Sequence, residues 1–128
     1  LFDNESVLVY GELHPFCVAA MLNAACAQPG QRFYDLGSGT GKVVMLAELL
    51  GLQATGIELF QERCDASCRA LQRLRELEPG RHEQGIEFVK ANVLDYDFSD
   101  ADILFSTDIM WPPELRASVQ ETARKLKP

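Results

Sequence analysis

Short apolar runs alternate with longer amphipathic segments along the whole chain. The apolar runs are rich in β-branched and aromatic residues and are bounded by glycine, proline or polar residues, which is typical of buried strands. They fall at residues 31–36, 53–58, 85–90 and 102–107. Strands and helices that alternate in this way predict a parallel sheet flanked by helices on both faces, an α/β fold.

The predicted helices are punctuated by proline and glycine, which begin and end helices for steric reasons. The first has Pro15 in its first turn and stops at Pro29-Gly30. The others are expected at residues 41–51, 60–77 and 112–127. Residues 91–101 are too short and too polar a segment to be predicted as a helix.

The composition indicates one globular domain rather than a disordered or membrane-spanning chain. The 128 residues are 47% hydrophobic and 24% charged, and no apolar run approaches the length of a membrane span. Without a secretory signal the four cysteines are expected to be reduced thiols, in the nucleus or the cytoplasm. The net charge of −7 argues against nucleic-acid binding and favours a cationic partner. Because the chain opens on Leu1 and stops at Pro128, we expect a piece of a longer protein.

Cysteine and histidine offer no metal site. Cys64, Cys68 and Leu71 recur at helical spacing in the segment 60–77, so both cysteines are predicted to belong to the core. His14 and His82 have no partner pattern and are expected on the surface.

Three glycines on alternate positions follow the first predicted strand, in the stretch FYDLGSGTGKVV at residues 33–44. Glycine lets the backbone turn tightly and approach a ligand with no side chain in between. The helix that follows directs its N–H groups and positive dipole end toward any anion there. A nucleoside triphosphate, a dinucleotide and S-adenosylmethionine are the three ligands that use this geometry.

The spacing distinguishes the three ligands. A phosphate-binding P-loop requires glycine where Leu36 stands and a hydroxyl residue where Val43 stands. The dinucleotide fingerprint requires a small residue where Lys42 stands. The remaining ligand is S-adenosylmethionine. Its candidate contacts in this loop are Asp35, Leu36, Gly37, Ser38, Gly39, Thr40, Gly41 and Lys42.

Two later strand ends supply further candidate contacts. Glu58 ends the second predicted strand, where a carboxylate can accept hydrogen bonds from both ribose hydroxyls; the alternative is an exposed surface residue. Asn92 and Val93 follow the third strand and can read the edge of an adenine through a side-chain amide and a backbone N–H. Asn92 as a plain turn former is the competing interpretation.

Residues 33–128 resemble the class I, or seven-strand, methyltransferases, and the chain from about residue 7 resembles one branch of them. The stretches LVYGELHPF and ILFSTDIMWPPEL are similar to segments of the disruptor-of-telomeric-silencing family, the non-SET histone lysine methyltransferases. The resemblance implies a Rossmann-like fold, present here as a partial domain over residues 1–128 that ends after the helix following strand four. It also implies that Tyr10, Gly11, Glu12 and Leu13 fold over the methionine end of the cofactor.

The resemblance further implies an S-adenosylmethionine-dependent N-methyltransferase that acts on a protein lysine, with a histone as one possible substrate. Methylation of a small molecule or of another protein nitrogen, and a cofactor-binding scaffold without activity, remain as alternatives. The chain departs from the family pattern at Lys42, Asn92 and Thr107-Asp108, where the family usually has glutamine, an acid and Asn-Asn. No contact with nucleic acid or a membrane is expected.

The acceptor side is expected in the loop after strand four. Thr107 and Asp108 can accept hydrogen bonds from an amine, and Trp111 can hold an alkylammonium ion by cation–π attraction. The alternative for Trp111 is simple packing beneath the prolines that follow it. The aspartates that crowd this half of the chain either steer a cationic substrate or form a solvated loop; they are Asp95, Asp97, Asp100, Asp102 and Asp108.

Overall fold

The computed structural model describes residues 13–107 and 111–126 of the chain. The strands are β1 (Arg32–Leu36), β2 (Gln53–Glu58), β3 (Ile86–Lys90) and β4 (Ile103–Phe105). The helices are α2 (Pro15–Ala24), α3 (Lys42–Leu49), α4 (Gln61–Leu77) and α5 (Pro113–Arg124). The α/β prediction is therefore confirmed, with most boundaries shifted by a few residues. Residues 91–101 contain turns and bends but no helix.

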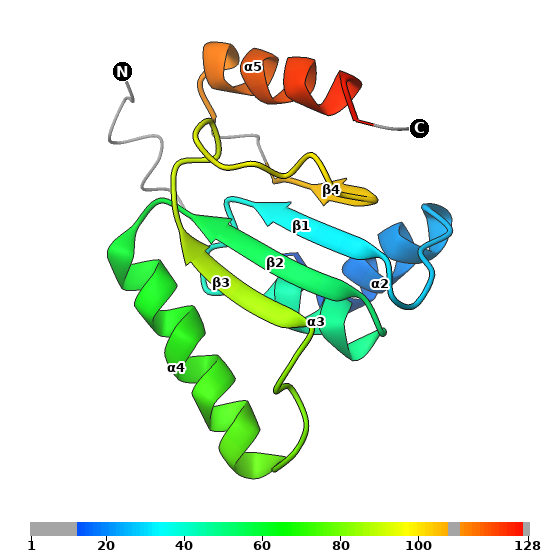
Figure 1. Ribbon diagram of the computed structural model, residues 1–128, viewed down its shortest axis with the longest axis vertical. Coiled ribbons are helices and arrows are strands. Elements are labelled where there is room, and N and C mark those ends of the chain that lie inside the picture. Colours follow the sequence, from blue (N-terminus) through cyan, green and yellow to red (C-terminus); the bar gives the residue numbers. More distant parts are fainter. Residues whose placement is uncertain (1–12, 108–110, 127–128) are drawn as a thin grey trace.

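The four strands form one parallel sheet in the order β3-β2-β1-β4 (Figure 1). In the register of β1, Asp35 lies beside Gly56 of β2 on one side and beside Phe105 of β4 on the other. Because all strands run the same way, their carboxyl ends meet along one edge of the sheet. That edge carries the loops that contain most of the predicted site residues.

One face of the sheet is covered by α2, α3 and α4. Phe33 of β1 is fully buried there with Val44 and Ala47 of α3 and with Val18 of α2. Leu71 brings α4 into the same core. This packing follows from the period of two along a strand, which directs alternate residues to opposite faces.

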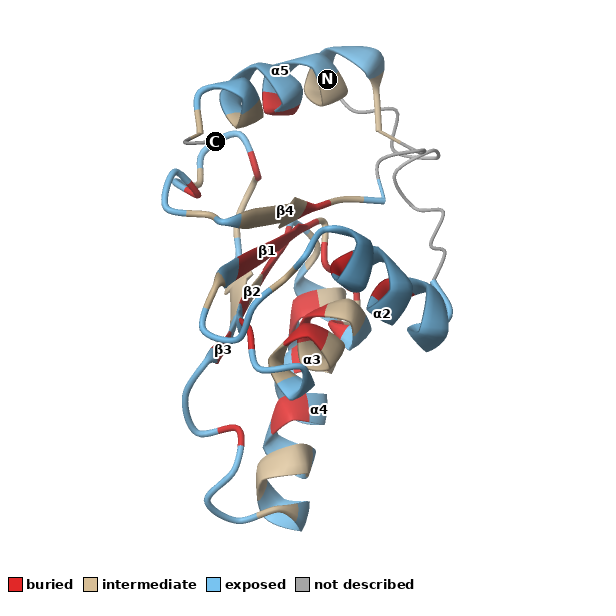
Figure 2. Cartoon of the chain, turned by 90° about the vertical axis from the view of Figure 1, so that its right-hand side faces the viewer, coloured by how far each residue is buried: buried red, intermediate tan, exposed pale blue. Residues whose placement is uncertain are grey.

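The other face is covered by α5 and by the segment between β3 and β4. Tyr34 and Leu36 of β1 point to this side and pack with Phe98, Val93 and Val119. Figures 1 and 2 show α5 separated by the sheet from the other helices, with buried positions concentrated on the strands and inner helix faces. β1 is therefore buried on both faces, as expected for a central parallel strand.

The amino end of β1 is fastened by two of the aspartates that precede β4. Asp100 pairs with the Arg32 guanidinium and accepts a hydrogen bond of 2.7 Å from the Tyr34 hydroxyl. Asp102 accepts from the backbone N–H of Arg32 at 2.8 Å. Burial and the Asp100 acceptor raise the pKa of Tyr34, while the hydrogen bond from Tyr34 lowers the pKa of Asp100. Asp100 and Asp102 therefore fasten β1 to the segment before β4, at the end of the strand away from the glycine loop.

Two expectations about individual side chains are wrong. Cys68 is exposed, because the buried stripe of α4 runs through Cys64, Ser67 and Leu71 and the serine takes the inner position. His82 is only 5% exposed: its Nδ1 lies 2.7 Å from Oε2 of Glu48 on α3, and its Nε2 lies 3.5 Å from Oε2 of Glu78. His14 is exposed as expected and accepts a hydrogen bond from the Phe16 N–H at the start of α2.

The helices within residues 13–107 and 111–126 include none with the length and apolar character needed to cross a membrane.

Gly41 offers a direct test of the packing between α3, α4 and β3. Its φ is +87°, and a Cβ there would lie 2.5 Å from two ring atoms of Phe88 and 3.0 Å from Cβ of Ser67. Gly80 has a similar φ of +83° but no heavy atom within 4 Å of the same position. We expect Gly80→Ala to lower the free energy of unfolding by about 1–2 kcal/mol, from the left-handed backbone alone. Gly41→Ala should cost about 1–3 kcal/mol more, because overpacking adds to the backbone strain.

Urea denaturation of the two variants measures this difference. Equal losses for Gly41→Ala and Gly80→Ala would show that the space around Gly41 is not tightly filled.

Candidate functional site

The glycine loop turns from β1 into α3 through three left-handed residues. Gly37, Gly39 and Gly41 have φ values of +85°, +57° and +87°, a region that side chains disfavour. The backbone N–H groups of Gly37 and Ser38 donate to the carbonyl of Ile57 at 2.8 and 3.0 Å. These bonds hold the loop against the end of β2. Glycine occurs at every second position because the backbone is left-handed at each of these positions.

The amino end of α3 opens directly on this loop. Gly41 is the N-cap residue, in the left-handed conformation, and no side chain caps the helix there. The first-turn N–H groups of a helix have no partner within the helix and carry the positive end of its dipole. This end of α3 is consequently suited to an anionic group.

Glu58 is fixed beneath the loop by two backbone hydrogen bonds. It is only 4% exposed, so the surface interpretation is wrong. Its Oε2 accepts from the Gly39 N–H at 2.7 Å and its Oε1 accepts from the Phe60 N–H at 3.1 Å. A carboxylate has about four acceptor positions, so hydroxyl donors can still be received at the same oxygens.

Buried polar atoms without a partner gather at the same edge of the sheet. Among the described residues, Asp35 Oδ1, Ser38 Oγ and Ser106 Oγ are buried and accept or donate no hydrogen bond. Burial, and to a smaller extent the charge of Glu58, raises the pKa of Asp35 to about 7. Unpartnered buried polar atoms are costly and need an explanation. A polar ligand with a cationic group near Asp35 supplies one, so these residues fit the predicted cofactor.

The turn after β3 gives Asn92 a structural role. Its Oδ1 accepts a hydrogen bond of 3.0 Å from the Leu94 N–H, which is the turn-forming arrangement. The nitrogen of the same amide carries two donors that this bond leaves unused. The neighbouring Val93 is buried through its side chain in the core beneath α5. Contact of either residue with an adenine stays a prediction.

Trp111, in the segment between β4 and α5, lies against the glycine loop. Three of its ring atoms come within 3.3–3.8 Å of the position that a Cβ on Gly37 would take. The residue is half-buried against the core that includes Leu36 and Val119, and its carbonyl accepts from Arg116 Nη2 at 3.2 Å. Trp111 thus both packs in a core and forms a wall beside the loop. Thr107 is exposed just before this segment.

Several predicted site residues fall outside this geometry. Asp108, Tyr10, Gly11 and Glu12 lie outside the described residues, and Leu13 is 36% exposed immediately before α2. No group of three His, Cys, Asp or Glu side chains within the described ranges is arranged to hold a metal ion.

Sequence reasoning missed the residues that support the loop from outside. A Cβ on Gly56 would lie 2.7 Å from Ser38 Oγ and 2.9 Å from Val44 Cγ2, so β2 needs glycine where the loop crosses it. A glycine inside a predicted strand is a known signal of such a close approach. Two further residues gave no comparable signal in the sequence: Ser106, whose hydroxyl is buried at this edge without a hydrogen-bond partner, and Arg116, which donates to the Trp111 carbonyl.

Comparison with known proteins identifies the family. The sequence pattern of the family described as "Histone methylation protein DOT1" matches residues 2–128. The chain belongs to the DOT1 family. A Dictyostelium discoideum protein named "Histone-lysine N-methyltransferase, H3 lysine-79 specific" is 31% identical over 125 residues, covering 91% of the chain and 7% of that protein. A protein of the same name from Eremothecium gossypii is 31% identical over 140 residues, covering 99% of the chain and 24% of that protein. The chain therefore spans less than a quarter of the length of these two relatives.

Solved structures show the same fold. An RNA methyltransferase from Salinibacter ruber, in complex with S-adenosyl-L-homocysteine, superimposes with a TM-score of 0.72 at 23% identity, covering 92% of the chain and 72% of that protein. Magnesium protoporphyrin IX methyltransferase from Synechocystis, with bound S-adenosylmethionine, gives 0.67 at 18% identity, covering 94% and 63%. The Rossmann-like class I methyltransferase fold of this DOT1-family chain is thereby confirmed.

The raised pKa of Asp35 makes a prediction about stability. In the folded chain this carboxyl keeps its proton up to about pH 7, whereas its ordinary value is 3.8. The folded state therefore binds more protons than the unfolded state between these pH values, and its stability falls as the pH rises through them. Asp35→Asn removes the titration, so the variant should gain stability relative to the wild type from pH 4 to pH 8.

Thermal or urea unfolding of both proteins across this range measures the effect. Asp97→Asn is a suitable control, because Asp97 is exposed and its pKa is lowered, so its titration falls below pH 4. Parallel pH profiles for wild type and Asp35→Asn would contradict the assignment.

Proposed function

We propose that this DOT1-family chain is the S-adenosylmethionine-binding part of a methyltransferase that transfers a methyl group to a protein lysine amine. The observation that carries the proposal is the joining of Glu58 to the glycine loop through the Gly39 N–H. A carboxylate buried under three left-handed glycines suits a ribose beside an unhindered backbone. The family membership and the class I fold support the same cofactor.

Each loop has a separate part in holding the cofactor. Asp35, with its unpartnered oxygen, receives the α-ammonium group of the methionine moiety. The uncapped amino end of α3 faces its carboxylate. Glu58 receives the ribose hydroxyls, and Asn92 and Val93 meet the adenine. The segment from Tyr10 to Leu13 is proposed to close over the methionine end.

When bound, S-adenosylmethionine would supply a methyl group on a sulfonium ion, whose methyl carbon a neutral amine can attack in line while the thioether leaves. The chain contributes position and orientation more than acid–base chemistry. Trp111 provides an aromatic wall between the glycine loop and the acceptor side, where a cationic methylated amine is attracted to the ring. Thr107 and Asp108 orient the amine by accepting its hydrogen bonds.

A histone is the acceptor that the relatives favour, because both relatives described above are named as specific for lysine 79 of histone H3. The net charge of −7 is complementary to a basic protein of this kind. A histone substrate would place the protein in the nucleus, one of the two compartments left open by the sequence.

Removing Glu58 tests the cofactor site. We expect Glu58→Ala to weaken S-adenosylmethionine binding by about 1–3 kcal/mol, the usual cost of losing a charge-assisted hydrogen-bond partner. Glu58→Gln should lose less, because it keeps an acceptor for the Gly39 N–H. Calorimetry measures both, with the exposed Glu62→Ala on α4 as the matched control.

NAD and ATP serve as further controls, since the loop lacks both phosphate fingerprints. Unchanged affinity in Glu58→Ala, or tight binding of NAD in place of S-adenosylmethionine, would contradict the assignment.

Removing the acceptor-side residues separates an enzyme from a cofactor-binding scaffold. In the full-length protein, Asp108→Ala and Trp111→Ala should each lower the single-turnover methyl-transfer rate while leaving cofactor affinity nearly unchanged. Loss of orientation alone can reduce a rate about a hundredfold. The assay uses labelled cofactor with nucleosomes and with free histones, followed by mass spectrometry of the labelled residue.

Glu114→Ala, an exposed change in the first turn of α5, is the control for this segment. Wild-type rates in both variants would remove these residues from the mechanism. No transfer by the wild type to any protein amine would favour the scaffold.

A further inference from the structure

A groove separates α3 from α4 on the outer side of these helices. It has a volume of about 410 Å³, within the range of about 300–1,000 Å³ typical of binding sites. Its lining comes from the two helices and from the end of the glycine loop; these residues are Thr40, Lys42, Met45, Ala66, Ala70, Arg73 and Leu74. None of the roles assigned above to the cofactor or the acceptor uses its α4 wall.

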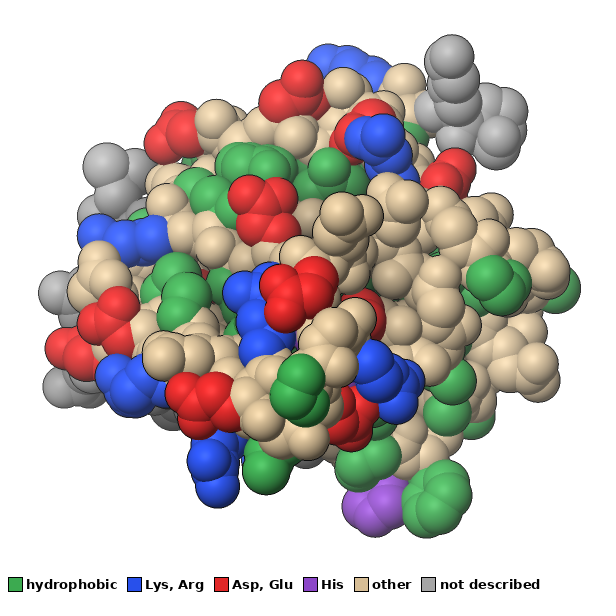
Figure 3. Space-filling model, turned by 60° about the horizontal axis from the view of Figure 1, so that its bottom comes forward, with side chains coloured by type: hydrophobic (Ala, Val, Ile, Leu, Met, Phe, Trp, Pro, Cys, Tyr) green, Lys and Arg blue, Asp and Glu red, His purple; other side chains and the backbone are tan. Residues whose placement is uncertain are grey.

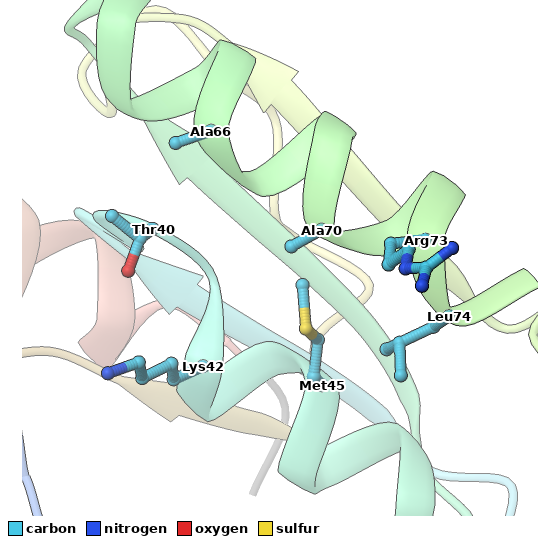
Figure 4. A pocket seen from close by; sticks show the side chains of 7 residues that line it. All are labelled: Thr40, Lys42, Met45, Ala66, Ala70, Arg73 and Leu74. Carbon is cyan, nitrogen blue, oxygen red and sulfur yellow. The ribbon is translucent and has the colours of Figure 1, made fainter. Parts of the chain in front are cut away.

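The floor of the groove is apolar and its two ends are cationic. Figure 4 shows Met45 and Ala70 in the middle, Lys42 beside the glycine loop at one end, and Arg73 at the other. Of the seven described residues that line it, two are cations and none is a carboxylate. The groove is thus locally positive in a chain that is negative overall, with 19 acidic and 12 basic residues. On the face shown in Figure 3 the two kinds of charge are mixed.

The spacing on α4 suits a helical occupant. Ala66, Ala70 and Leu74 recur every four residues, the repeat through which one helix packs on another. The two alanines allow a close axial approach, and the repeat extends about 12 Å along α4 at 1.5 Å per residue. A helix laid in such a groove inserts apolar side chains at spacings of three and four.

The cation at the far end is available to a partner. Arg73 lies 3.4 Å from Glu76 in the next turn, but both side chains are exposed, at 69% and 55%. Exposed ion pairs of this kind contribute little, about 0–1 kcal/mol, so a carboxylate from another chain can replace Glu76 at small cost.

We propose that the groove between α3 and α4 docks an acidic amphipathic helix of a partner protein, with apolar side chains over Met45 and Ala70 and carboxylates directed to Lys42 and Arg73. The occupant rests on Thr40 and Lys42, which also belong to the glycine loop. The docking surface therefore borders the cofactor site without sharing the residues proposed to bind the acceptor.

Selection from an unbiased library tests the proposal. Peptides of about four helical turns, randomised over acidic, basic, neutral polar and apolar residues, are displayed and selected on the full-length protein. We expect enriched sequences to carry a central apolar residue with carboxylates on both sides of it, matching the cations at the two ends of the groove. Their dissociation constants are then measured by fluorescence anisotropy at low and high salt.

Two variants locate the binding surface. Ala70→Arg fills the groove and Arg73→Glu reverses its far end, and each should weaken the selected peptides by at least about tenfold. Arg69→Glu is the matched control: it makes the same charge change on an exposed arginine of α4 outside the lining, and should change affinity by less than about twofold. All three changes are at exposed positions, and unchanged cofactor affinity shows that fold and cofactor site are intact.

Several outcomes would overturn the proposal. They are enrichment of basic or uncharged peptides, no enrichment above background, full binding by Ala70→Arg, and equal losses for Arg69→Glu and Arg73→Glu. Self-association of the wild type that Ala70→Arg abolishes in sedimentation would assign the groove to a second copy instead. Because cofactor binding is measured separately, failure here leaves the methyltransferase proposal standing.

Discussion

The hydrogen bond between the Gly39 N–H and the Glu58 carboxylate joins the two halves of the site. It links the loop after β1 to the end of β2, and both partners are buried at the edge where the parallel strands end. The bond requires a backbone that can approach a carboxylate closely, which explains glycine in the loop. The packing of the same loop explains the glycine in β2, Gly56, because the Ser38 side chain lies where a Cβ on Gly56 would be. The backbone conformation of the loop and the glycine at position 56 of β2 therefore depend on each other.

The two ends of β1 are stabilised in different ways. At the amino end, Arg32, Tyr34 and Asp100 satisfy one another, so charge and hydroxyl groups are paired within the chain. At the carboxyl end, Asp35 retains an oxygen without a partner and holds its proton to higher pH than usual. The polar groups of β1 are hydrogen-bonded within the chain at its amino end, whereas at its carboxyl end one oxygen has no partner. A polar ligand can therefore bind at the carboxyl end.

Much of the fold was predictable because local rules agreed with one another. The alternation of runs predicted the α/β class, and the segment 53–58 matches β2 to the residue. Proline and glycine lie near the ends of α3 and α4, but α2 ends at Ala24, well before the predicted stop at Pro29-Gly30. The glycine loop could be predicted because the spacing of its glycines reflects backbone angles, which depend on local sequence. Side chains whose surroundings come from distant elements were not readable. His82 is buried by Glu48, thirty-four positions earlier, and Cys68 is exposed because Ser67 fits the inner face of α4. The contact between Trp111 and Gly37 likewise joins positions that no periodicity connects.

The strand order has a consequence for how the molecule acquires its site. β1 lies between β2 and β4, and its partners in β4 are about seventy positions away in sequence. Long-range pairings of this kind form slowly, because the loop between them must lose entropy before any contact rewards it. Trp111, which lies against Gly37, follows β4 in the sequence, so this contact is also long-range. During synthesis the glycine loop therefore emerges well before Trp111. One side of the loop stays uncovered until the segment after β4 has been made and Trp111 can pack against Gly37.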